Sequence, residues 1–131
     1  MIFGIGTDII EIDRIQKAID RTKGFLSRNF SEKEIIYFEE KKFKAETIAG
    51  NFSSKESVSK AIGTGFRGFS LKDVEILRDD LGKPLVVVSD KIDKILRERG
   101  IKNYKFHISI SHNKGNAISY VILEGDKYEN F

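Results

Sequence analysis

The sequence predicts an α+β fold in a single domain, with a small, mainly antiparallel sheet packed against helices. Apolar residues recur at helical spacing through most of the first half of the chain, whereas the second half alternates apolar and polar residues as strands do. A strand, a run of helices and then mainly antiparallel strands is an order typical of α+β proteins. A chain of 131 residues is long enough to bury one hydrophobic core.

A short buried strand is expected over residues 2–5, followed by a helix. Ile12, Ile15 and Ile19 recur at positions i, i+3 and i+7, so they share one face of that helix. Three cations fall almost opposite them: Arg14, Lys17 and Arg21. The helix should therefore bury its isoleucines and present a basic stripe to solvent.

Two further helices are predicted in the first half. Ser31 and Glu34 form a capping-box pattern, in which each side chain bonds the other residue's backbone N–H at a helix start. Helical spacing then continues from about residue 45 to residue 62. Gly50 lies inside this segment, where glycine costs about 1 kcal/mol relative to alanine, so we expect another element to approach closely there.

The second half should contain strands and one helix. The pattern predicts a strand over residues 74–78, a turn at 82–84, a strand over 85–88 and a helix that ends at Gly100. Two alternating runs then flank residues 112–116, and we expect a β-hairpin with one apolar face, made of Phe106, Ile108, Ile110, Ile118, Tyr120 and Ile122. The domain is expected to span residues 1–124, which leaves a short polar tail over 125–131.

Composition excludes several classes of site. The chain has no cysteine, which excludes disulfides, thiolate metal sites and cysteine nucleophiles. Two histidines are too few for a His-rich zinc site. The N-terminus lacks a basic signal region and no apolar run is long enough to span a bilayer, so we expect a soluble, cytoplasmic protein with no membrane partner.

Positive charge is concentrated in one segment. The net charge is only +3, yet five cations and one anion lie between residues 14 and 28. Such a patch favours an anionic partner: nucleic acid, an acidic protein or a phosphorylated cofactor. A non-catalytic nucleic-acid-binding module is the alternative from another class, but the chain lacks an RNA-binding aromatic signature, and we expect no nucleic-acid partner.

Asp8, Glu56 and Lys60 are the first candidates for chemistry. Asp8 follows the first predicted strand beside Gly6, where a carboxylate can bind a metal ion, although it would also suit the cap of the next helix. Glu56 and Lys60 lie four residues apart on the long predicted helix, and spacing alone favours a surface ion pair. A metal site requires Asp8 to lie alongside Glu56.

Two loops carry weaker signals. Gly63-Thr64-Gly65 follows the long helix and is typical of a left-handed C-cap, although its backbone amides could also approach a phosphate. His112 ends a predicted strand, where it could bind a phosphate or only stabilise a turn. His107 lies on the polar face of the same strand and is interpreted as structural.

Together these motifs resemble one family. Ile5-Gly6-Thr7-Asp8, followed after a gap by the segment FSSKESVSK from Phe52 to Lys60, is similar to the two-part signature of the 4′-phosphopantetheinyl transferases. Three further fragments resemble its short, single-domain branch, the holo-acyl-carrier-protein synthases: Gly63-Thr64-Gly65, Gly82-Lys83-Pro84 and Ser109-Ile110-Ser111-His112. The resemblance extends from Ile5 to about Leu123, and the polar tail matches nothing.

The resemblance implies a reaction and a site. Family members transfer phosphopantetheine from coenzyme A to a serine of an acyl carrier protein, for fatty acid synthesis, and release adenosine 3′,5′-bisphosphate. Asp8 and Glu56 would hold Mg²⁺, with Mn²⁺ as an alternative, and Lys60 would stabilise or protonate the leaving group. The general base stays open between a metal-bound water and Glu56 acting through water. The coenzyme A pocket would be formed by Ser59, Lys60, Gly63, Thr64, Lys83, Pro84 and His112.

The resemblance also implies partners. Acyl carrier proteins are small and acidic, so Arg14, Lys17 and Arg21 would dock one. The short branch typically forms homotrimers with active sites between subunits. A coenzyme A-binding regulator that has lost catalysis is a further alternative, against which the intact Asp8, Glu56 and Lys60 argue.

Overall fold

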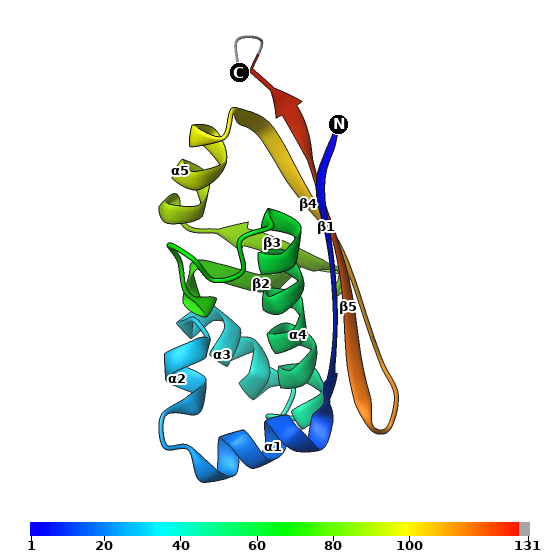
Figure 1. Ribbon diagram of the computed structural model, residues 1–131. Coiled ribbons are helices and arrows are strands. Elements are labelled where there is room, and N and C mark those ends of the chain that lie inside the picture. The colour runs from blue at the N-terminus through cyan, green and yellow to red at the C-terminus, as the bar shows by residue number, and fades with distance from the viewer. Residues whose placement is uncertain (129–131) are drawn as a thin grey trace.

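The computed structural model describes residues 1–128 and has the predicted α+β architecture (Figure 1). The first half contains one strand and four helices: β1 (Ile2–Glu11), α1 (Ile12–Arg21), α2 (Phe25–Asn29), α3 (Glu32–Glu40) and α4 (Ala45–Ile62). The second half contains a 3-10 turn η1 (Leu71–Asp73), β2 (Val74–Arg78), β3 (Pro84–Val88), α5 (Asp90–Glu98), β4 (Ile101–His112) and β5 (Asn116–Lys127). Within these residues no helix is long and apolar enough to cross a membrane.

Three long strands form the main sheet, in the order β1-β5-β4, with both pairings antiparallel. β2 and β3 form a separate antiparallel pair. In Figure 1 the helices and the β2–β3 pair all lie on the same side of the main sheet. The sheet therefore has one face on the core and one face that no other element within residues 1–128 covers.

Helix α4 is the centre of the molecule and packs directly on β1. Two glycines of β1 permit this contact, because a Cβ atom on Gly4 would lie 1.7 Å from the carbonyl oxygen of Ala61, and one on Gly6 would lie 1.8 Å from that of Ser57. No side chain fits at such distances, so only glycine allows the helix backbone to rest on the strand. This contact decides which residues of α4 face β1.

Several sequence predictions are confirmed. Ser31 and Glu34 form both bonds of the capping box at the start of α3, and α4 has the predicted bounds. Gly50 is closely approached, since a Cβ there would lie 3.1 Å from Cγ2 of Ile110. Gly63 ends α4 in the left-handed conformation with φ of 92°, as a C-cap glycine does.

Other predictions are wrong in position. β1 runs ten residues to Glu11, so Asp8 lies within the strand rather than at its end, and Glu11 rather than Asp8 precedes α1. The strand is longer than predicted because its partner β5 continues to pair with it as far as Asn116. The short helix α2 was not anticipated.

The tail boundary also moves. β5 extends to Lys127, so residues 125–127 belong to the sheet, where Gly125 bonds Met1 and residue 127 pairs with Ile101. The predicted boundary at residue 124 therefore falls inside a strand, while residues 129–131 of the predicted tail lie outside the described residues.

The predicted single apolar face of the β4–β5 hairpin is wrong. Ile108 of β4 pairs with Val121, and Phe106 pairs with Leu123, so β5 directs Val121 and Leu123 into the core. Ile118 and Tyr120 therefore lie on the opposite face, together with Ile9 of β1. Where a strand has apolar residues on both faces, alternation alone does not show which face is buried.

We call this uncovered surface the outer sheet face. Its large apolar residues keep roughly half of their surface exposed: Ile5 53%, Ile9 65%, Ile118 44% and Tyr120 46%. They come from two neighbouring strands and are adjacent in register, since Ile9 pairs with Ile118. A contiguous apolar surface of this kind is typical of a protein interface.

Candidate active site

Asp8, Glu56 and Lys60 meet where α4 crosses β1. Asp8 and Glu56 line the same cavity, whose volume is about 420 Å³. Lys60 Nζ donates to the carbonyl oxygen of Thr7 at 2.9 Å and lies 3.4 Å from Oδ1 of Asp8. The structure thus brings together three charged side chains that lie up to 52 positions apart in the sequence.

The ion pair that spacing suggested is replaced by another. Lys60 pairs with Asp8 on the neighbouring strand, and the Glu56 carboxylate has no hydrogen bond or ion pair with any residue from 1 to 128. Asp8 keeps 17% of its side chain exposed, and Glu56 is half-buried. The site therefore presents one paired and one unpaired carboxylate to the cavity.

The surroundings of Glu56 disfavour its negative charge. Partial burial raises the pKa of Glu56 above its usual value, the nearby charge of Asp8 raises it further, and Lys60 lowers it. Lys60 pairs with Asp8 and Arg14 lines the same cavity, but neither cation bonds the Glu56 carboxylate. A bound divalent cation would neutralise the charge of Glu56.

The donor set fits magnesium. Within residues 1–128 no group of three or more histidine, cysteine, aspartate or glutamate side chains is placed to hold a metal ion. Mg²⁺ is commonly held by only one or two carboxylates and completes its shell with water and substrate phosphate oxygens. Asp8 and Glu56 supply that number of carboxylates beside an open cavity.

The same cavity continues under helix α1. Arg14 lines it together with apolar side chains from α1, α2 and α4: Ile15, Ala18, Phe25 and Phe52. Arg14, Lys17 and Arg21 are all exposed on α1, as the sequence predicted, and Lys17 pairs with Asp13 at 2.9 Å. The basic stripe therefore begins at the edge of the carboxylate pair.

The other candidate residues lie elsewhere. Pro84 and His112 line a second cavity with Gly50, Arg78 and Ile110, and Lys83 and Pro84 line a third with His107. Neither of these cavities includes Asp8, Glu56 or Lys60. Within one chain the proposed coenzyme A residues are thus divided between two regions.

Ser59, Gly63 and Thr64 lie at the end of α4. Ser59 is buried and its hydroxyl donates to the Glu56 carbonyl oxygen at 2.7 Å. The Thr64 hydroxyl donates to the carbonyl of Gly65 at 3.0 Å, and Gly63 is exposed. His107 bonds Glu124 across the strands at 2.9 Å, which agrees with its interpretation as structural.

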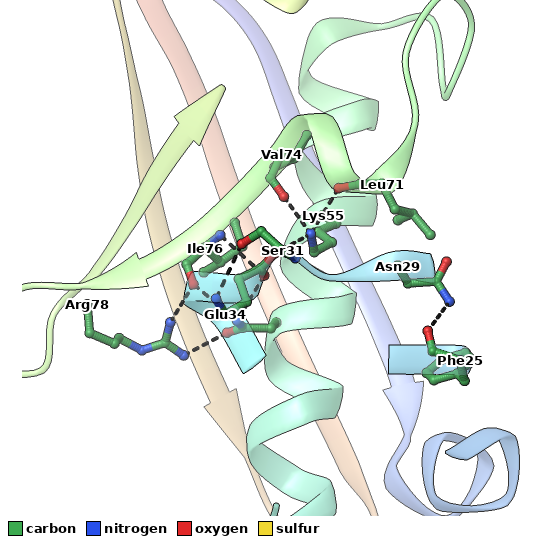
Figure 2. A network of polar contacts seen from close by, with 10 residues as sticks. Phe25, Asn29, Ser31, Glu34, Lys55, Leu71, Val74, Ile76 and Arg78 are labelled. Carbon is green, nitrogen blue, oxygen red and sulfur yellow. Dashed lines mark hydrogen bonds and ion pairs between the residues drawn. The ribbon is translucent and has the colours of Figure 1, made fainter. Parts of the chain in front are cut away.

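Sequence reasoning missed the residue next to Glu56. Lys55 has no exposed surface, and its ammonium donates to Glu34 Oε1 at 2.6 Å and to the carbonyls of Leu71 and Val74 (Figure 2). Burial lowers the pKa of Lys55 and raises that of Glu34, and their mutual attraction opposes both shifts. The capping box had marked Glu34, but no local pattern connects it to Lys55.

The polar network around Glu34 extends to Arg78. Asn51 donates to Glu34 Oε2 and to the carbonyl of Ile76, each at 3.1 Å, and accepts from Arg78 Nη2 at 2.9 Å. These bonds tie α4 to α3 and β2, and Figure 2 shows three residues that Asn51 bonds: Glu34, Ile76 and Arg78. The face of α4 that carries Asn51 and Lys55 is therefore fixed by buried, hydrogen-bonded polar groups.

Comparison with protein families gives a clear match. Residues 4–121 match the model of the 4′-phosphopantetheinyl transferase superfamily. A holo-[acyl-carrier-protein] synthase of Clostridium beijerinckii is 59% identical over 124 residues, which cover 95% of this chain and 98% of the relative. The similarity thus includes β1, all of the helices and nearly all of the sheet.

Solved structures agree. The holo-[acyl-carrier-protein] synthase of Neisseria meningitidis has a TM-score of 0.84 and 32% identity, with 95% of this chain and 99% of that chain covered. The Helicobacter pylori enzyme, solved in complex with coenzyme A, has a TM-score of 0.79 and 34% identity, with 92% and 99% covered. The arrangement of strands and helices described above is therefore shared with these proteins.

Proposed function

The chain belongs to the 4′-phosphopantetheinyl transferase superfamily, and we propose that it performs the reaction of its holo-[acyl-carrier-protein] synthase relatives. In that reaction the 4′-phosphopantetheine group of coenzyme A is transferred to a serine of an apo-acyl carrier protein. The product serves fatty acid synthesis, and we place the enzyme in the cytoplasm, where that synthesis takes place.

The unpaired Glu56 carboxylate is the observation that carries the proposal. It lies beside Asp8 in one cavity, and its charge is disfavoured by burial and by that neighbour. We propose that Asp8 and Glu56 hold Mg²⁺, or Mn²⁺ in its place, when coenzyme A binds. The ion would neutralise negative charge on the pyrophosphate and help to orient it.

The bond changes define what the protein must do. The serine oxygen forms a bond to the phosphorus next to pantetheine, the bridging P–O bond of the pyrophosphate breaks, and adenosine 3′,5′-bisphosphate leaves. We propose that Lys60 stabilises the charge on the leaving phosphate, because its side chain is 52% exposed and lies against Asp8. The proton of the serine must pass to a base, for which Glu56 acting through water is a candidate.

We propose that the coenzyme A pocket is completed by a second subunit. Ser59, Gly63 and Thr64 would line it from the subunit that supplies Asp8, and Lys83, Pro84 and His112 would line it from a neighbour. Lys83, Pro84 and His112 line cavities that do not include Asp8 or Glu56, and this separation within one chain supports the arrangement.

The outer sheet face supports a homotrimer as the assembly. Its exposed isoleucines and Tyr120 supply the apolar surface that a stable subunit interface needs. Light scattering on the chain in solution tests this point and should give three times the 14.9 kDa chain mass. A Tyr120→Glu variant should shift the mass towards that of one chain.

We propose that the acidic carrier protein docks on the basic stripe of α1. Arg14 lines the cavity of the carboxylate pair, and Lys17 and Arg21 continue the stripe along the exposed face of the helix. Opposite charges on two partners speed their encounter and select their orientation. The carrier serine would then reach the pyrophosphate close to Asp8 and Glu56.

One experiment tests the proposed reaction. The chain is incubated with apo-acyl carrier protein, coenzyme A and Mg²⁺, and the carrier is weighed by mass spectrometry. A gain equal to one phosphopantetheine group, abolished by a chelator and restored by Mg²⁺ or Mn²⁺, is expected. An unchanged carrier mass with several apo-carrier proteins would contradict the assignment.

A further inference from the structure

Three buried hydroxyl groups meet between α4 and β5, behind the carboxylate pair. Ser53 and Ser57 come from α4 and Ser119 from β5, and none is more than 1% exposed. Ser119 Oγ lies 2.8 Å from Ser53 Oγ and 2.5 Å from Ser57 Oγ. We call these three residues the serine cluster.

The serine cluster is bonded to both sides of the site. Ser53 Oγ is within 3.1 Å of the carbonyl oxygen of Asp8, to which it can donate. Ser57 Oγ lies 3.3 Å from the carbonyl oxygen of Ser119. On β5, Ser119 is the register partner of Asp8. Ser53 and Ser57 stand one helical turn apart and lie on either side of Glu56 in the sequence.

The hydroxyl protons can satisfy this arrangement fully. If Ser53 donates to Asp8 and Ser57 to the carbonyl of Ser119, then the Ser119 hydroxyl can donate to either of the other two. Each buried hydroxyl thereby donates one bond, which offsets the cost of removing it from water. The cluster is a closed network rather than a set of unsatisfied groups.

Glycine contacts and hydroxyl bonds constrain α4 in different ways. Gly4 and Gly6 set how closely the helix backbone approaches β1, because they remove the side chains between them. Steric contact of this kind limits distance but permits rotation and sliding of the helix. Hydrogen bonds are directional, so the bonds of Ser53 and Ser57 fix the rotation of the helix at Glu56.

We propose that the serine cluster positions Glu56 against Asp8, so that the two carboxylates are held at the separation that a divalent cation needs. Ser53 and Ser119 are thus positioning residues, which act on the cation only through the carboxylates. This inference rests on the proposed function, because it presupposes that Asp8 and Glu56 share a cation. Changes to groups that orient metal ligands typically reduce metal affinity about 10- to 100-fold.

Ser54 offers a matched control. It lies on α4 beside Ser53 and is equally buried, but its hydroxyl donates to Gly50 of the same helix at 2.7 Å and has no bond to a strand. Ser54→Ala therefore deletes a buried hydroxyl from α4 without altering the bonds between α4 and the sheet. Any general effect of losing such a group should appear in this variant as well.

Direct cation binding tests the inference. Mn²⁺ is titrated into the full chain with coenzyme A present, and free Mn²⁺ is measured by electron paramagnetic resonance, with thermal unfolding recorded in parallel. Ser53→Ala and Ser119→Ala should each weaken Mn²⁺ binding about 10-fold. Ser54→Ala should leave the Mn²⁺ dissociation constant within about 2-fold of the unaltered chain, even where its unfolding temperature falls.

The outcomes separate this inference from the proposed function. If the unaltered chain binds Mn²⁺ and the Ser53 and Ser119 variants bind it as tightly as Ser54→Ala does, the positioning role is wrong while the metal site stands. If the unaltered chain does not bind Mn²⁺ at all, the metal site itself is wrong, and the inference is lost with it. Weaker binding in all three variants alike would also contradict a specific role for the cluster.

Discussion

Lys55 and Glu56 are neighbours on α4, yet the charge of Lys55 is bonded to other groups and the charge of Glu56 is not. Lys55 is fully buried and bonded to one carboxylate and two backbone carbonyls. Glu56 is half-buried, and within residues 1–128 its carboxylate has no hydrogen-bond or ion-pair partner. Helix α4 therefore carries a bonded, buried charge at Lys55 and, at the next residue, a carboxylate charge without a bonded partner.

This difference distinguishes a charge that supports the fold from one that we propose serves a ligand. Lys55 ties α4 to α3 and β2, and its removal would leave Glu34 buried and unpaired. The Glu56 carboxylate makes no hydrogen bond or ion pair with residues 1–128, and burial and Asp8 both act against its charge. A carboxylate that the fold leaves uncompensated in a cavity is available to a ligand, which we propose is a divalent cation.

The largest expected effect is on activity at Glu56. Glu56→Ala should reduce phosphopantetheine transfer about 1,000-fold or more, because the cation loses one of its two carboxylates. Transfer rates measured by mass spectrometry, with Glu39→Ala as an exposed control on α3, would show this. A Glu56→Ala variant with normal transfer would refute the metal role.

Replacement of Glu56 should lower activity but should not lower the stability of the fold. The raised pKa of Glu56 means that its ionised form is less favourable in the folded chain than in the unfolded chain. The folded state therefore loses stability as pH rises through the range in which Glu56 ionises. Glu56→Gln should unfold at an equal or higher urea concentration than the unaltered chain at pH 7 without metal. A clear loss of stability would show that Glu56 supports the fold.

Lys55 should show the opposite pattern. Lys55→Ala leaves the Glu34 carboxylate without its partner in the core, which we expect to cost about 3–5 kcal/mol in the free energy of unfolding. The Lys55→Met/Glu34→Gln double variant should recover part of that loss, because neither buried charge remains. Urea denaturation measures both. Equal losses in the single and double variants would show that the uncompensated charge is not the cause.

Gly6 tests whether the contact between α4 and β1 assembles the site. Gly6→Ala would place a Cβ 1.8 Å from the carbonyl of Ser57, so the helix must shift. We expect a loss of about 1–3 kcal/mol in unfolding free energy, together with weaker Mn²⁺ binding. Gly115→Ala is the control, because a Cβ there meets nothing within 4 Å. Full Mn²⁺ affinity in Gly6→Ala would mean that the site tolerates displacement of α4.

The smallest expected effect concerns docking. Arg14→Glu should raise the KM for the carrier protein about 10-fold while it changes the KM for coenzyme A far less, because Arg14 belongs to the stripe on which we propose that the acidic carrier docks. Lys94→Glu on α5, which makes the same charge change on another exposed helix, should alter neither. Equal changes in both KM values for Arg14→Glu would contradict docking on the stripe.

Much of the fold follows from local patterns. The capping box of Ser31 and Glu34 and the C-cap at Gly63 mark helix ends by chemistry within a few residues, and the structure confirms both. The end of α4 was accurate for the same reason, whereas its start, where Lys44 provides no side-chain cap, followed from the helical spacing of apolar residues. The buried face of β5 was predicted wrongly, because Ile118 and Tyr120 are large hydrophobic residues like those that enter the core. Only the pairing with β4 decides which set is buried.

The site depends on contacts that local patterns do not contain. Spacing alone predicted an ion pair between Glu56 and Lys60. In the structure Lys60 pairs instead with Asp8, which is far away in the sequence. The prediction that Asp8 and Glu56 share a site came from the resemblance to a family and not from spacing. Lys55 carried no local signal at all, since a lysine on a helix is usually exposed.

We propose that Asp8 and Glu56 hold one cation between them. Crystals of the chain grown with Mn²⁺ and coenzyme A would test it directly by anomalous diffraction at the manganese absorption edge. The account predicts an anomalous peak within coordination distance, about 2.0–2.3 Å, of carboxylate oxygens of both residues. A manganese ion bound elsewhere, with Asp8 and Glu56 both free of it, would contradict the account.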